Sequence, residues 1–134
     1  MIMLDKRLRA AVLVVAGFGL ALPAAAAGDG YSLLRGLDKG AWQIKYREGG
    51  KAQRLCVKSG MELLSIGNPP SGCRRFVVKD SEGSLDVQLT CPGRGYARTS
   101  LRKETGSLVQ VEAQGVRNGA PYSVRGEARR TGSC

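Results

Sequence analysis

The stretch VQVEAQGVRNGAPYSVRGEA, from Val109 to Ala128, decides the fold of this protein. Apolar and polar residues alternate on both sides of Asn118-Gly119, a dipeptide that is the strongest short signal for a two-residue β-hairpin turn. A turn at this position pairs Ala113 with Val124 and Val109 with Ala128, so that small and apolar side chains share one face. The sequence therefore predicts two long antiparallel strands here.

Two further turns extend this sheet towards the N-terminus, and both bring apolar residues to the same face. The expected pairs are Phe76 with Leu89 and Val78 with Val87 across Glu82-Gly83, then Leu101 with Val109, Thr99 with Val111 and Ala97 with Ala113 across Glu104 to Gly106. A slip of one residue would turn every side chain to the opposite face, so three turns that agree on one face support each other. We expect a consecutive antiparallel sheet.

A separate hairpin and one short helix precede this sheet. AWQIKY (Ala41 to Tyr46) and AQRLCV (Ala52 to Val57) alternate on either side of Gly49-Gly50. Ser59 and Glu62 form a capping box that predicts a helix ending before Gly67. The expected fold class is mainly β: one antiparallel meander sheet, curved or partly closed like a barrel, with one short helix and disulfide bonds. An open sheet and a closed barrel both fit the sequence.

The first 27 residues have the features of a secretory signal peptide. Lys6, Arg7 and Arg9 are followed by an apolar run from Ala10 to Leu22 and by the small residues 24–27. The run of 13 residues is shorter than the 20 or so that a transmembrane helix needs, so an uncleaved anchor is the weaker interpretation. We expect residues 1–27 to be removed, residues 28–134 to form a single β-rich domain, and the protein to be periplasmic or secreted with no transmembrane segment after cleavage.

The four cysteines of a short exported chain are expected to form two disulfides. They are Cys56, Cys73, Cys91 and Cys134. A zinc site made of the four thiolates is the weaker alternative, because no two of them have C-x-x-C spacing. The pairing of Phe76 with Leu89 sets Cys73 and Cys91 on opposite faces, which favours Cys56 with Cys73 and Cys91 with Cys134. The second pair conflicts with the expected sheet, whose last strand leaves at the end far from Cys91, so the connectivity stays open.

The chain is strongly basic, with 21 basic and 11 acidic side chains. The expected signal peptide contains three of the basic and one of the acidic residues, which leaves 18 and 10, a net charge of +8. Such a charge attracts anionic partners. The candidate anion-binding residues are Arg94, Arg98, Arg102, Arg125 and Arg129. The alternative is cross-strand charge pairing on a solvated face, with Glu112 between Arg98 and Arg125.

CPGRGYARTSLRK, from Cys91 to Lys103, contains two glycines around an arginine and suggests a phosphate-binding loop at first sight. It lacks the G-x-x-x-x-G-K-[ST] spacing and no helix follows it, so we interpret its glycines as a corner between two strands. Tyr96, Arg98, Ser100 and Arg102 then face outward. Because nucleic-acid binders combine basic residues with several aromatic platforms, the few aromatic residues of this face argue against specific nucleic-acid binding.

The residues available for chemistry argue against an enzyme. The chain has no histidine, which removes the commonest general base and metal ligand and every Ser-His or Cys-His pair. Five acidic residues fall at predicted turns or caps, where such residues have structural uses: Glu48, Glu62, Asp80, Glu82 and Glu104. No catalytic residue, metal site or cofactor is expected. The first hypothesis is a non-catalytic envelope domain that binds an anionic envelope component. The second is an inhibitor or chaperone-like module that binds another envelope protein through an exposed sheet edge.

Several short motifs together resemble a bacterial family of small exported proteins, the domain of unknown function family 3617. They are KGAWQI (Lys39 to Ile44), RLCV (Arg54 to Val57), Cys73, LTC (Leu89 to Cys91) and the terminal EARRTGSC (Glu127 to Cys134), and the resemblance covers residues 36–134. Ala41 stands where the family commonly has a larger apolar residue, and Ser133 where it has an acid. The resemblance implies an envelope location and a β-rich fold; the family supplies no catalytic residue.

Overall fold

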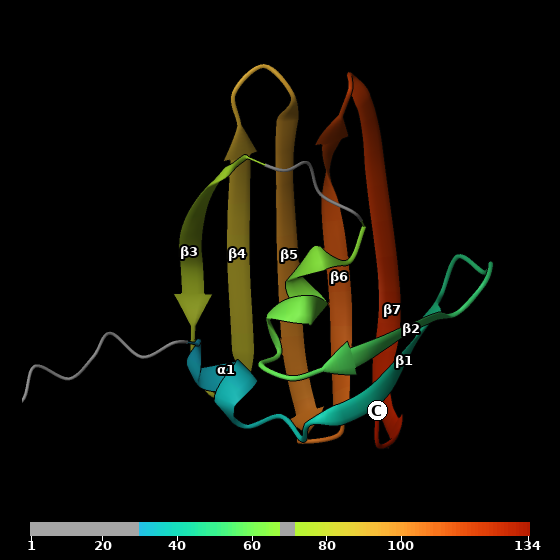
Figure 1. Cartoon of the computed structure of the whole chain (residues 1–134). Helices are drawn as coiled ribbons and strands as arrows, with labels where there is room; N and C mark the ends of the chain where they lie inside the picture. Colours follow the sequence, from blue (N-terminus) through green and yellow to red (C-terminus); the bar gives the residue numbers. More distant parts are fainter. Residues whose placement is uncertain (1–29, 68–71) are drawn as a thin grey trace, which may run out of the picture.

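The computed structural model describes residues 30–67 and 72–134, which form one antiparallel sheet of seven strands with two short helical turns (Figure 1). In chain order the elements are α1 (Ser32–Arg35), β1 (Gly40–Tyr46), β2 (Gln53–Val57), the 3-10 helix η1 (Met61–Ser65), β3 (Arg74–Asp80), β4 (Ser84–Cys91), β5 (Gly95–Thr105), β6 (Leu108–Arg117) and β7 (Ala120–Gly132). The strand order is β2-β1-β7-β6-β5-β4-β3, so β2 and β3 are the two edges and the sheet is open. This confirms the mainly β fold and excludes a closed barrel.

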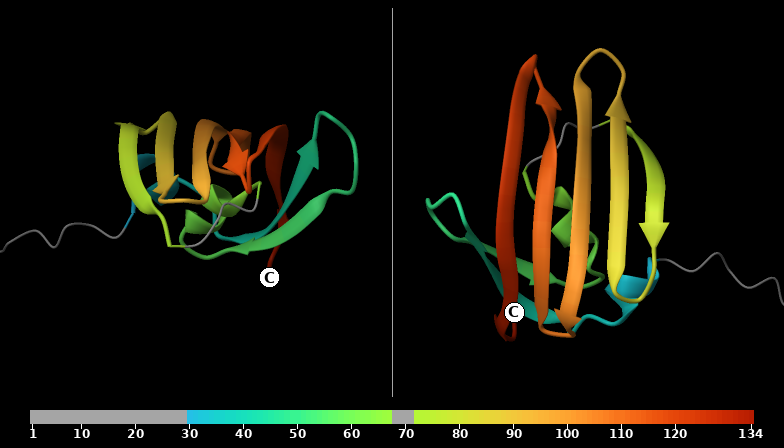
Figure 2. Two further views of the ribbon diagram at one scale, coloured as in Figure 1. Left: turned by 90° about the horizontal axis from the view of Figure 1, so that it is seen from above. Right: turned by 180° about the vertical axis from the view of Figure 1, so that it is seen from behind.

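The sheet is curved, and one of its faces is covered (Figure 2). The β1–β2 hairpin bends away from the layer of β3–β7, and η1 lies on the same side of that layer, whereas the opposite face of β3–β7 is uncovered. We call the covered side the inner face and the other the outer face. Trp42, Ile44, Leu63, Val109 and Ala128 are among the residues of the core on the inner face. The missed helix α1 adds Leu33 and Leu34 to it.

The hairpin that the Asn118-Gly119 turn predicts is confirmed. Val109 pairs with Ala128 and Ala113 with Val124. Asn118 has φ 52° and Gly119 φ 78°, the left-handed conformation at both central residues that a tight two-residue hairpin turn requires. The hairpin of β1 and β2 is confirmed as well, with Trp42 opposite Leu55.

The register between β5 and β6 differs from the prediction by two residues. Leu101 lies opposite Val111 instead of Val109, and Ala113 lies opposite Thr99. The turn contains Gly106 and Ser107, and an irregularity between Lys103 and Thr105 precedes it. Because the side-chain period of a strand is two, the shift keeps the predicted apolar residues on the inner face.

The register between β3 and β4 differs by one residue, and this changes the faces. Beside the turn, Lys79 pairs with Asp86 as predicted, but a β-bulge at Val78 follows, so that Phe76 pairs with Gln88 instead of Leu89. The predicted pairs of Phe76 with Leu89 and of Val78 with Val87 are therefore wrong. The alternation along the chain gives no sign of an extra residue, so the sequence could not locate the bulge.

The bulge also explains why the favoured disulfide connectivity is wrong. The shifted register places Arg75 opposite Leu89, which makes Cys73 the next residue to face Cys91, and these two form a disulfide. The other disulfide joins Cys56 to Cys134. Ala41 of β1 pairs with Cys56 on one side and with Gly132 on the other, so the C-terminus reaches β2 across β1.

Two disulfides in a chain of this size are typical of an oxidising compartment, extracellular or periplasmic. Within residues 30–67 and 72–134, no helix is long and apolar enough to cross a membrane. The expected signal peptide, residues 1–27, lies outside the described residues.

The predicted helix from Ser59 to Ile66 is instead a single 3-10 turn, η1. Glu62 caps the chain before it, because its carboxylate accepts hydrogen bonds from the backbone N–H groups of Lys58 and Gly60 at 3.0 and 2.8 Å. The Ser59 hydroxyl accepts the N–H of Met61 at 3.2 Å, two residues on, where an α-helical capping box would bond three residues on. The buried residues Leu63 and Leu64 of η1 cover the inner face.

Candidate functional site

The predicted anion-binding arginines lie on the outer face and at one corner of it, and four of the five are paired with carboxylates. Arg98 donates two hydrogen bonds to Asp86, one of them from Nε to Oδ1 at 2.9 Å. The other pairs are Arg102 with Glu104 at 3.4 Å, Arg125 with Glu48 at 3.6 Å and Arg129 with Glu127 at 3.0 Å. The fifth, Arg94, lies in the turn between β4 and β5 and has no ion pair among the described residues.

The predicted position of Glu112 is wrong in detail. The two-residue shift between β5 and β6 places Glu112 opposite Ser100, and Arg98 opposite Gln114, although Glu112 does face Arg125 on β7. Arg98 finds its carboxylate on the other neighbouring strand, at Asp86 of β4.

The outer face therefore carries mixed charge. A shallow groove of about 440 Å³ crosses it, and Lys79, Arg102 and Arg125 line this groove together with the carboxylates of Asp86 and Glu112. Exposed ion pairs contribute 0 to about 1 kcal/mol each, so they organise the surface more than they stabilise it. An anion that bound here would have to displace carboxylates from the arginines.

Two carboxylates of this face, those of Asp86 and Glu127, are poor proton donors because their pKa values are lowered. The hydrogen bonds from Arg98 lower the pKa of Asp86 below its usual value, against the opposing effect of burial. The hydrogen bond from Arg129 lowers the pKa of Glu127, and Gln110 adds to the effect. Both groups are ionised at neutral pH, whereas a general acid needs a pKa raised towards 7. Within the described residues no group of three or more potential ligands could hold a metal ion.

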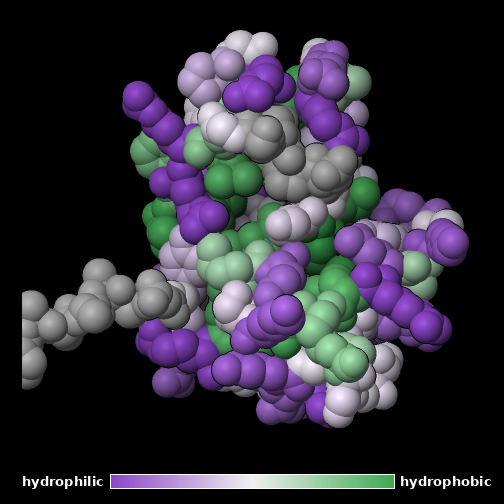
Figure 3. Space-filling model, viewed as in Figure 1, coloured by the Kyte–Doolittle hydropathy of each residue, from purple (hydrophilic) through white to green (hydrophobic). Residues whose placement is uncertain are grey.

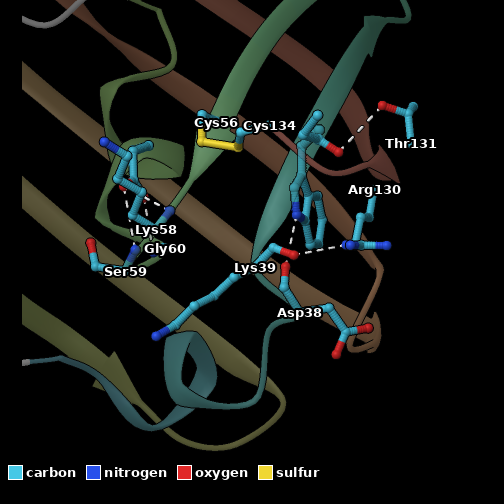
Figure 4. The surroundings of a disulfide bond; sticks show 12 residues. Asp38, Lys39, Cys56, Lys58, Ser59, Gly60, Arg130, Thr131 and Cys134 are labelled. Carbon is cyan, nitrogen blue, oxygen red and sulfur yellow. Dashed lines mark hydrogen bonds between the residues drawn. A yellow bond between two sulfur atoms is a disulfide. The ribbon is translucent and has the colours of Figure 1, made fainter.

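A second basic site lies between α1 and the loop that follows β2. Leu34, Leu37 and Val57 form the apolar floor of a cavity of about 430 Å³, and Arg35, Lys39 and Lys58 line it as well. Figure 4 shows the Lys39 side chain extending from the segment before β1 over α1, on the side of the molecule where Lys58 and Ser59 also lie. No ion pair to Arg35, Lys39 or Lys58 is found in the described part of the chain.

The third candidate is the edge strand β3, all seven residues of which are exposed. Phe76, Val77 and Val78 are 52%, 48% and 55% exposed. Arg74, Arg75 and Lys79 flank this apolar run. We call Arg74 to Lys79 the β3 edge. The sequence-based prediction placed Phe76 and Val78 in the core. A short continuous apolar run is typical of a buried strand, so no sequence signal marked this edge as exposed.

No protein-family model, no curated protein and no solved structure matches this chain. The resemblance to the domain of unknown function family 3617 therefore stays a prediction from the sequence motifs.

Proposed function

We propose that this protein is a non-catalytic binding module of the periplasm or extracellular space, and that it binds an extended segment of another protein along the β3 edge. The exposed apolar run Phe76–Val78 on the last strand of an open sheet carries this proposal. A sheet edge has unpaired N–H and C=O groups on its open side, and these are ready to hydrogen-bond an added strand.

The β3 edge is only partly protected against such pairing. Soluble proteins commonly blunt an exposed edge with a lysine or with a β-bulge. Both devices occur in β3, as Lys79 and the bulge at Val78, and they lie in the half near the β3–β4 turn. The half from Arg74 to Val77 pairs regularly with β4, so its open side is suited to a partner strand.

The charges beside the apolar run select the partner. Arg74 and Arg75 precede it and Lys79 follows it, so an extended segment with an apolar centre and acidic flanks complements the β3 edge. A second copy of the same strand is a poorer partner. An antiparallel pair of β3 strands centred on Val77 would place Arg75 opposite Lys79 twice, and like charges directly opposite each other are destabilising. The two Arg74–Asp80 pairs of the same register would only offset this repulsion, whereas an acid-flanked segment has no such repulsive pair.

The test uses the exported protein and a synthetic peptide of nine residues, in which alternating Val and Thr are flanked by Glu at both ends. We expect the peptide to shift the backbone NMR signals of Arg74–Val77 and to slow their amide exchange. Val77→Lys should weaken this binding at least tenfold, which corresponds to about 1.4 kcal/mol. Tyr96→Lys is the matched control, because Tyr96 is a similarly exposed apolar residue on the central strand β5.

Three results would contradict the proposal. One is that a peptide with lysine in place of glutamate binds as tightly as the original peptide. Another is that Tyr96→Lys weakens binding of the original peptide as much as Val77→Lys does. The third is a dimer through β3 at micromolar concentration, which would make the second copy the occupant.

An anionic envelope component is the second candidate partner, and the unpaired cations around the cavity between α1 and β2 favour it. If it binds there, the double variant Lys39→Gln with Lys58→Gln should leave a heparin column at clearly lower salt than the wild type. The control, Lys45→Gln with Lys51→Gln, changes the net charge equally at positions outside the cavity. Equal elution of the two double variants would show that only the net charge matters.

A further inference from the structure

A cavity of about 220 Å³ lies between η1 and the inner face of β3, β4 and β5. Its apolar walls are Met61 and Leu64 of η1 and Val87 and Leu89 of β4. Figure 3 shows apolar surface gathered on this side of the molecule beside η1, over β3 and β4. The volume equals about seven water molecules at ~30 Å³ each. It is smaller than the 300–1,000 Å³ typical of sites for drug-sized ligands, so it suits a chain of roughly eight heavy atoms.

Thr99 is a polar residue in the wall of this cavity that core packing does not explain. It is 4% exposed, and within the described residues it is the one buried polar side chain of the core. Its strand neighbours on either side are Val87 and Ala113. Its hydroxyl makes no hydrogen bond within residues 30–67 and 72–134, and its oxygen is not among the fully buried polar atoms, so it is open to the cavity that Thr99 lines. A ligand in the cavity can therefore reach this hydroxyl, which both donates and accepts hydrogen bonds, whereas a valine at this position would offer only a methyl group.

Arg75 supplies a positive charge at the other side of the same cavity. It pairs with Leu89, so it lies on the inner face, whereas its neighbour Arg74 pairs with Thr90 on the outer face. No carboxylate forms an ion pair with Arg75 in the described part of the chain. Arg75 and Thr99 lie two strands apart and are offset by two residues along the strands. Spacings of about 4.8 Å between strands and about 3.4 Å per residue separate their backbones by roughly 12 Å.

We propose that this cavity binds a medium-chain acyl carboxylate that carries a second polar group near its far end. The apolar chain lies against Met61, Leu64 and Val87, the carboxylate binds the guanidinium of Arg75, and the far hydroxyl or carbonyl bonds the hydroxyl of Thr99. An extended chain of about eight carbons with an oxygen at each end has a length comparable to the roughly 12 Å that separates the two residues. The site does not depend on a partner strand at the β3 edge, since Thr99 and η1 lie away from that edge.

The test compares four defined probes on the exported protein by calorimetry and NMR: octanoate, 8-hydroxyoctanoate, 1,8-octanediol and octylammonium. We expect 8-hydroxyoctanoate to bind more tightly than octanoate, by about fivefold for one added hydrogen bond of ~1 kcal/mol. The uncharged diol and the cation should bind at least tenfold more weakly. Signals of Leu64, Val87 and Thr99 should shift on binding.

Variants separate the two polar contacts. Thr99→Val should leave the octanoate affinity unchanged and remove the advantage of the hydroxylated probe, a result that a purely structural role of Thr99 would not give. Arg75→Gln should weaken both carboxylates at least tenfold. Arg74→Gln is its matched control, with the same charge change on the adjacent residue of the opposite face, and should have little effect.

Four outcomes would overturn the proposal. If no probe binds, the cavity is a packing defect. If Arg74→Gln weakens binding as much as Arg75→Gln, the attraction is only the net charge of the domain. If octylammonium binds as well as octanoate, the site is a hydrophobic trap without a carboxylate contact. Signal shifts confined to β3, with Leu64 and Thr99 unchanged, would assign the binding to the β3 edge instead.

Discussion

Removing each disulfide in turn tests which cysteines are paired and how much each disulfide contributes to the free energy of unfolding. The two double variants are Cys56→Ala with Cys134→Ala, and Cys73→Ala with Cys91→Ala. The first opens a bridge between residues 78 apart in the sequence, and the second a bridge between residues 18 apart. Because a cross-link restricts the unfolded chain more when its loop is longer, loop-closure entropy predicts losses of about 4.5 and about 3 kcal/mol. We expect the first variant to be the less stable by roughly 1–1.5 kcal/mol.

Equilibrium unfolding in urea under non-reducing conditions measures these losses, with the m-value as a check that both variants unfold in two states. A thiol assay in denaturant then tests the pairing. The variant Cys73→Ala with Cys91→Ala should have no free thiol, since Cys56 and Cys134 remain joined. Two free thiols in that variant would refute the observed connectivity and support the pair Cys56–Cys73. A greater loss of stability from opening the shorter loop would refute the entropic reasoning.

Three further predictions concern single residues. Gly95→Ala should destabilise the protein by at least about 3 kcal/mol in urea unfolding, because Gly95 has φ 115° and an added Cβ would lie 1.9 Å from the carbonyl oxygen of Val116; unchanged stability would show that the chain passes this corner differently. Tyr122→Phe should raise the melting temperature, since the Tyr122 hydroxyl is buried without a hydrogen-bond partner in the described residues and its loss should contribute about 1 kcal/mol; a lower melting temperature would mean that the hydroxyl is satisfied. Arg98 lowers the pKa of Asp86 below the ordinary value of 3.8, so this pair stabilises the fold above that pH and the contribution is lost as the pH falls below it. Asp86→Asn should therefore flatten the loss of stability below pH 4 in acid titrations followed by circular dichroism, and an unchanged acid transition would contradict this linkage.

The candidate sites differ in how far the sequence reveals them. The outward direction of Arg98 and Arg102 follows from alternation along β5, and the structure agrees. Their carboxylate partners do not follow, because Asp86 meets Arg98 only through the register between β4 and β5. The cavity lined by Thr99 could not be predicted from the sequence, because residues of four separate elements, η1, β3, β4 and β5, form it together.

The sequence by itself determined the local features of this fold. Turn chemistry at Asn118-Gly119 and alternation on either side of it fix both the hairpin and its register, because two residues in the left-handed conformation leave one way to connect the strands. Four cysteines in a short chain predict two disulfides, and alternation predicts which residues of β5 face the core.

The tertiary structure decided whatever depends on a register that local turns do not fix. A bulge of one residue at Val78 turns Phe76 to the outer face and brings Cys73 opposite Cys91. Pairing of β1 with β7, far apart along the chain, brings Cys134 to Cys56. Such contacts depend on the packing of the whole sheet, in which one inserted residue reverses every face beyond it, and the sequence of a single strand contains no trace of that choice.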